Sequence, residues 1–205
     1  MTLAETLAFL LPPNAELRFG ELYLTRDKGG VFAVRHRDDR KSEDGLEIVE
    51  NCNDLRELAK FDSEGEYRPL KTAPTLRSGW VTKSDDAEEF LARLDAIYPA
   101  VFATWISYEK SELDAISLRD TLNRQTGMYK FAGSITDQMA NEIMRSTCGK
   151  GCIRLIAWPI ENDCPVSRLK AAKDTLPVIC TEACTFAVSE ARRLAKEAYE
   201  KANAT

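Results

Sequence analysis

Five of the six cysteines of this 205-residue chain lie between positions 148 and 184, and this clustering constrains the fold more than any other feature. No secretory signal is recognised, and no apolar run reaches the ~18 residues that a membrane span needs. We therefore expect a cytoplasmic protein with no membrane partner. In a reducing compartment, clustered cysteines are more often metal ligands or catalytic groups than disulfides. The five cysteines are Cys148, Cys152, Cys164, Cys180 and Cys184.

Two cysteine pairs share one spacing, Cys148-Gly-Lys-Gly-Cys152 and Cys180-Thr-Glu-Ala-Cys184. In a helix, this spacing separates the two Cβ atoms by about 5–6 Å. A single zinc ion, with Zn–S bonds of about 2.3 Å, holds neighbouring sulfurs only about 3.8 Å apart. The wider spacing favours a [4Fe–4S] cluster, which four thiolates ligate. We predict Cys148, Cys152, Cys180 and Cys184 as its ligands, with Cys164 as the substitute ligand, while structural zinc, disulfides and inert thiols remain alternatives.

The residues next to the cysteines favour an anionic cluster. Thr181 is the predicted N-cap of a helix that runs to about residue 202, with Cys180 just outside the helix and Cys184 in its first turn. The unpaired N–H groups of a helix N-terminus bind anions such as thiolate and sulfide. Lys150 adds positive charge between the cysteines of the first pair.

The hydrophobic patterns predict an α+β protein. We expect an N-terminal domain, residues 1–110, with an antiparallel hairpin and helices, and a mostly helical, cysteine-rich domain, residues 111–205. Gly20 marks a phase slip within the first strand and is interpreted as a bulge. Residues 101–108 fit a strand or a helix, and residues 67–80 an ordered loop. The remaining predicted helices are 2–11, 53–61, 85–98, 113–125, 134–145 and 181–202, and the predicted strands are 16–25, 31–35, 46–49 and 152–160.

The composition narrows the function classes. The formal net charge is −5, and nucleic-acid-binding domains usually carry a basic footprint, so no nucleic-acid partner is expected. The basic run 35–37 alternates with acidic residues and is interpreted as a solvated loop in which the lone His36 is incidental. No phosphate loop, dinucleotide fingerprint or zinc-protease motif is present, and whether the protein is an enzyme stays open. Cys52 is predicted to be a core residue.

Several runs resemble a known family: residues 70–80, 97–100 and 125–129, together with the two cysteine motifs. The family comprises bacterial multidomain proteins in which CbiX-type chelatase domains of cobalamin and sirohaem synthesis precede a stabilising domain and a small [4Fe–4S] domain. The resemblance covers most of the chain. It implies a cluster on the late cysteines, a supporting front domain and a link to tetrapyrrole metabolism. This sequence has no room for a chelatase domain, so chelatase activity is not carried over, and a redox or chelatase-type protein partner is expected.

Three functions are compatible with these features. The first is electron transfer or another redox role of a [4Fe–4S] protein. The second is an interaction module stapled by structural zinc. The third is an enzyme that uses the cluster at a substrate pocket.

Overall fold

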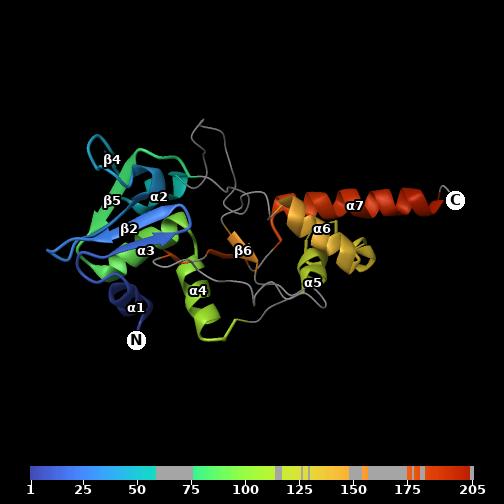
Figure 1. The fold of residues 1–205 in the computed structure, drawn as a ribbon, viewed down its shortest axis with the longest axis horizontal. Helices are drawn as coiled ribbons and strands as arrows, with labels where there is room; N and C mark the ends of the chain where they lie inside the picture. The colour runs from blue at the N-terminus through green and yellow to red at the C-terminus, as the bar shows by residue number, and fades with distance from the viewer. Residues whose placement is uncertain are drawn as a thin grey trace. The chain divides into compact units, whose positions relative to one another are not determined.

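The computed structural model shows two compact units (Figure 1). The first comprises Met1–Leu113 with Ala171–Val178, and the second Asp114–Lys170 with Ile179–Thr205. The domains expected from the sequence, residues 1–110 and 111–205, stay a prediction. No helix in the described part of the chain is long and apolar enough to cross a membrane. The structure describes residues 1–58, 76–113, 117–125, 127–128, 130–147, 154–156, 175–176, 178–180 and 183–203.

A six-stranded sheet, in the order β4-β5-β3-β2-β1-β7, organises the first unit. The inner strands β5, β3, β2 and β1 are antiparallel neighbours, whereas the short edge strands β4 and β7 pair in parallel. The strands are β1 (Glu16–Phe19), β2 (Leu22–Arg26), β3 (Phe32–His36), β4 (Glu47–Ile48), β5 (Trp80–Ser84) and β7 (Thr175–Leu176). The helices are α1 (Leu3–Leu10), α2 (Cys52–Leu58), α3 (Ala87–Ile97) and α4 (Val101–Glu109), with a 3₁₀ turn, η1 (Arg37–Asp39).

Helix α3 covers one face of this sheet (Figure 1). The ring of Phe32 in β3 stacks on that of Phe90 in α3, with centroids 5.0 Å apart. Phe19 of β1 makes edge-to-face contacts with Tyr98 and Phe102 at 6.1 and 6.3 Å. These rings fill the core because strand side chains alternate between faces, so every second residue points toward the helices.

The opposite face of the sheet is polar. The ring of Tyr23 lies under the guanidinium groups of Arg35 and Arg40, at 5.1 and 5.3 Å. The Glu43 carboxylate binds both Arg35 and Lys83. Charged residues therefore cover this face, while the helix-covered face holds the apolar core.

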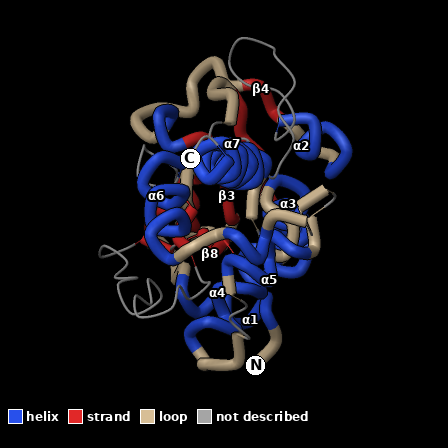
Figure 2. The backbone as a smooth tube through the Cα atoms, turned by 90° about the vertical axis from the view of Figure 1, so that its right-hand side faces the viewer, coloured by secondary structure: helices blue, strands red, loops and turns tan. Residues whose placement is uncertain are grey.

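The second unit is built from helices around one apolar cluster. Helix α6 (Asp137–Thr147) packs beside α7 (Thr185–Asn203) (Figure 2), and the two run antiparallel (Figure 1). On α7, the buried residues recur every three or four positions, which places them on one face. A two-stranded sheet pairs β6 (Arg154–Ile156) with β8 (Val178–Cys180). In the described part of this unit, the other elements are α5 (Leu118–Asn123) and η2 (Ala132–Ser134).

The mixed helix and strand content is confirmed, and several predicted elements need correction. Gly20 lies in a tight turn with φ of +61° between two separate strands, so its interpretation as a bulge is wrong. Residues 101–109 form a helix, and Trp80 begins a strand where a loop was predicted. Helix α6 starts at Asp137 rather than near Ser134, because the Thr136 hydroxyl accepts the N–H of Met139. Most of the predicted loop 67–80 lies outside the described residues.

Candidate metal centre

Cys180 and Cys184 stand on two different elements of the second unit. Cys180 is the last residue of β8, and Cys184 directly precedes α7. Both are half-buried and pack against the apolar cluster that α5, α6 and α7 form. The two thiols therefore lie at the edge of one core, where sulfur contacts apolar groups and is partly screened from water.

Cys184 occupies the N-cap position of α7. Its Sγ accepts the backbone N–H of Ala187 at 3.5 Å, and its carbonyl accepts the N–H of Val188 at 2.9 Å. The thiol thus replaces the serine, threonine or aspartate oxygen that usually caps a helix. The N–H and the positive end of the helix dipole both favour negative charge on this sulfur.

This arrangement corrects two expectations. The helix begins at Thr185, so Cys184 precedes it rather than lying in its first turn, and Thr181 lies outside the described residues. Because Cys180 ends a strand, the second pair does not share a helical turn, and the helical spacing argument does not apply to it. The predicted contact between a cysteine sulfur and a helix N-terminal N–H is nevertheless present.

Cys148, Cys152 and Cys164 lie outside the described residues, but elements on either side of the first pair are described. Helix α6 ends at Thr147, one residue before Cys148, and its C-terminal end lies beside the N-terminus of α7 (Figure 1). Strand β6 begins two residues after Cys152 and pairs with β8, which ends at Cys180. Among the described residues alone, no three metal-binding side chains form a metal site.

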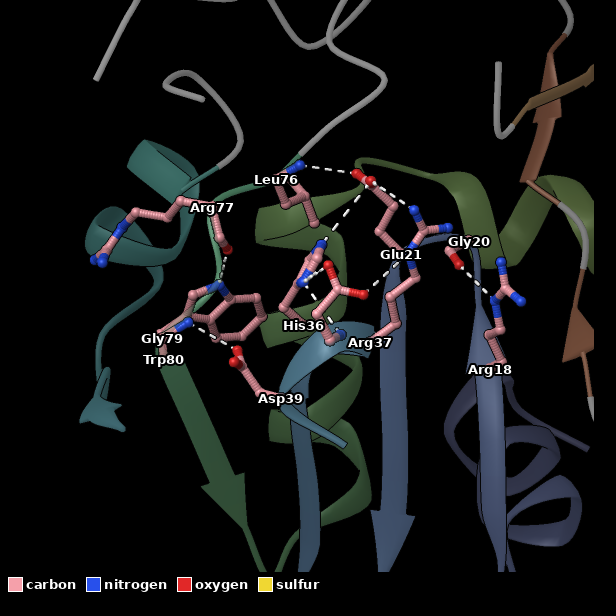
Figure 3. A network of polar contacts seen from close by, with 11 residues as sticks. Arg18, Gly20, Glu21, His36, Arg37, Asp39, Leu76, Arg77, Gly79 and Trp80 are labelled. Carbon is pink, nitrogen blue, oxygen red and sulfur yellow. Dashed lines mark hydrogen bonds and ion pairs between the residues drawn. The ribbon is translucent and has the colours of Figure 1, made fainter. Parts of the chain in front are cut away.

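A buried polar network occupies one end of the sheet in the first unit (Figure 3). His36 Nε2 lies 3.9 Å from Glu21 Oε1, and Arg37 Nη2 lies 3.8 Å from the same oxygen. His36 and Glu21 are only 5% and 1% exposed, so the prediction of an incidental histidine in a solvated loop is wrong. The signal missed in the sequence is the strand that ends at His36. Because His36 Nδ1 accepts the N–H of Asp38 at 3.3 Å, the proton of a neutral imidazole resides on Nε2, facing Glu21.

Two further hydrogen bonds of this network join backbone N–H groups to carboxylate side chains. Glu21 Oε2 accepts the N–H of Leu76 at 2.8 Å, and Asp39 Oδ2 accepts that of Gly79 at 2.7 Å. These bonds fix the segment that leads into β5, and we assign the network a structural role. Cys52 is half-buried at the start of α2 rather than a core residue.

Comparisons with known proteins agree with a cluster in the second unit. Residues 110–193 match the family model of a 4Fe-4S iron-sulfur cluster binding domain, and residues 8–109 match that of the DR2241 stabilising domain. The chain is therefore an iron–sulfur protein with a [4Fe–4S] cofactor. More specifically, residues 8–109 are similar to a DR2241 stabilising domain and residues 110–193 to a [4Fe–4S] cluster binding domain.

A solved structure is similar to most of this chain. DR2241 from Deinococcus radiodurans is 26% identical to this chain, with a TM-score of 0.69 over 89% of this chain and 39% of DR2241. This chain thus spans about two fifths of the length of DR2241. That protein is described as a multi-domain protein with structural similarity to chelatases and two additional novel domains. No curated protein sequence matches this chain.

Proposed function

We propose that Cys148, Cys152, Cys180 and Cys184 ligate the [4Fe–4S] cluster, with Cys164 as the substitute ligand. The contact between Ala187 N–H and Cys184 Sγ at the start of α7 carries this proposal. The chain enters the first pair directly after α6, at the end of that helix that lies beside α7. Four thiolates in two equally spaced pairs meet the ligand requirement of a cubane.

The proposed role is one-electron transfer. The bound cluster supplies the redox chemistry, and the protein sets how readily an electron is accepted. Ala187 N–H stabilises negative charge at Cys184, which raises the reduction potential. Met139 and Met144 are, like the two described thiols, partly buried against the same apolar cluster, and such an apolar shell is one of the features that set the potential of a bound cluster.

We also propose a link to tetrapyrrole metabolism, with a redox or chelatase-type protein as partner in the cytoplasm. The structural similarity of DR2241 to chelatases supports it. In this proposal residues 111–205 hold the cluster and residues 1–110 support that domain. No chelatase reaction is assigned to this chain.

The ligand set is tested by replacing each of the five late cysteines with serine and measuring iron and acid-labile sulfide in anaerobically purified protein. Each variant that lacks one of the four proposed ligands should lose most of its iron and sulfide. The Cys164→Ser variant should keep them. Cys52→Ser is the matched control, since Cys52 lies at the start of α2 in the first unit. Full cluster content in Cys184→Ser or Cys180→Ser would contradict the proposed ligand set.

A further inference from the structure

The edge strand β7 joins a proposed cluster ligand to the sheet of the first unit. β7 pairs in parallel with β1, with Phe19 opposite Leu176. Leu176 is 6% exposed, and Phe19 is 1% exposed within the aromatic cluster under the sheet. The strand is therefore seated on the core of the first unit, although it arrives from a distant part of the sequence.

The chain then passes directly to the ligand. Val178 belongs to the first unit and Ile179 to the second, and β8 ends at Cys180. Cys180 follows Leu176 by four positions, a reach of at most about 14 Å even when fully extended. Val178 and Ile179 are 0% and 3% exposed, so their side chains are held in packed surroundings.

We infer that pairing of β7 with β1 fixes the position of Cys180 for cluster binding, with Leu176 as a positioning residue. This inference rests on the proposed ligand role of Cys180. A two-residue strand has little stability of its own, so its order depends on the sheet edge and the core that receive it. The first unit thereby orders one ligand before the metal binds, which reduces the entropy lost on binding.

Coupling of this kind is reciprocal. If the seated strand favours the cluster, then the cluster must favour the seated strand to the same extent. Cluster binding should therefore protect the β7 edge of the sheet. The opposite edge, at β4, has no such covalent link to a cysteine of the second unit.

The first test is hydrogen–deuterium exchange of the full chain, with the cluster bound and after anaerobic removal by a chelator. Peptides that cover residues 16–19 and 175–180 should exchange faster in the cluster-free protein. Peptides that cover β4 and β5 should exchange at the same rate in both forms. Equal protection of β1 and β7 in the two forms would overturn the inference.

The second test replaces Leu176 with aspartate, with Leu176→Val as the conservative variant. The Leu176→Asp variant should lose its cluster to a chelator several-fold faster than the wild type. The Leu176→Val variant should lose it at the wild-type rate. Ile48→Asp on the opposite edge strand, where Ile48 is 69% exposed, should have the wild-type rate. Wild-type cluster stability in a folded Leu176→Asp variant would overturn the inference.

The two proposals fail in different ways. Loss of the cluster in Cys180→Ser, with a wild-type rate in Leu176→Asp, would leave the ligand set intact and remove only the role of β7. Retention of the cluster in Cys180→Ser would remove the ligand assignment itself. Exchange in the wild-type protein decides the role of β7 even where Leu176→Asp does not fold.

Discussion

Charged residues on the polar face of the six-stranded sheet contribute stability that depends on pH. Glu43 receives contacts from both Arg35 and Lys83. Partial burial alone would raise the pKa of Glu43, but the hydrogen bond from Lys83 and the charge of Arg35 outweigh it and hold this pKa below its ordinary value of 4.5. A lowered pKa in the folded state means that the ionised carboxylate stabilises the fold.

We therefore expect Glu43→Gln to destabilise the protein at neutral pH and not in acid. The contribution is complete above pH 4.5, the ordinary pKa, and is lost as the pH falls through the lower folded value. Because the Glu43 side chain is 36% exposed, solvent screening limits the difference to about 0.5 kcal/mol at pH 7. Urea unfolding of both proteins across this pH range measures it.

The control is Glu50→Gln, since Glu50 is exposed and no ion pair is seen for it in the described part of the chain. This variant should show no comparable pH-dependent difference from the wild type. A stability difference for Glu43→Gln that stays constant or grows as the pH falls would contradict the assignment.

At the scale of elements, the N-terminus of α7 is the feature that acts on the cluster. Its Cys184 cap leaves the sulfur hydrogen-bonded to Ala187 N–H. The same bond caps the helix when the thiol is free and stabilises negative charge when the thiolate binds iron. Such bonds to ligand sulfurs are one of the means by which a protein sets the reduction potential of a cluster.

Replacing Ala187 with proline removes this N–H in the first helical turn, where proline is tolerated. We expect a lower reduction potential, because the more negative reduced cluster loses a hydrogen-bond donor. A redox titration monitored by electron paramagnetic resonance compares the variant with the wild type. Thr185→Pro is the control, as proline is favoured at the first helical position. An unchanged potential in cluster-loaded Ala187→Pro would refute this role of α7.

Elements with local signals could be predicted from the sequence, and those that depend on distant partners could not. Helices α1 and α3 were predicted because each carries an apolar stripe at helical spacing. The cap expected for α3 was Ser84, whereas the structure has Asp86 at that position. Strand β5 pairs with β3 and β4, and β7 has two residues. Nothing local marks these two strands, since long-range pairing creates them.

The candidate site shows the same division. The clustering of five cysteines indicated a metal centre, because metal ligation depends on the type and number of the side chains available. The N-cap role of Cys184 was missed because cysteine is not a usual capping residue. The burial of His36 was missed because its charged neighbours suggest a loop. In the structure His36 is the last residue of β3, where it pairs with Leu22 of β2 and is buried.

For the whole molecule, the two units differ in how they reach stability. The first has a sheet, covering helices and a large aromatic core. Among its described residues, the second has a smaller apolar cluster around α6 and α7. Small cores gain much from a metal centre, because binding free energy becomes folding free energy. We therefore regard the cluster as part of the fold of the second unit as well as its redox group.

The most direct test of this account is the iron and sulfide content of anaerobically purified full-length protein, with Mössbauer spectroscopy to identify the cluster. The account predicts four iron and four sulfide per chain, as the formula of the cluster requires, with the spectrum of a cubane. Stoichiometric zinc without iron, or protein that folds fully with no metal, would contradict it.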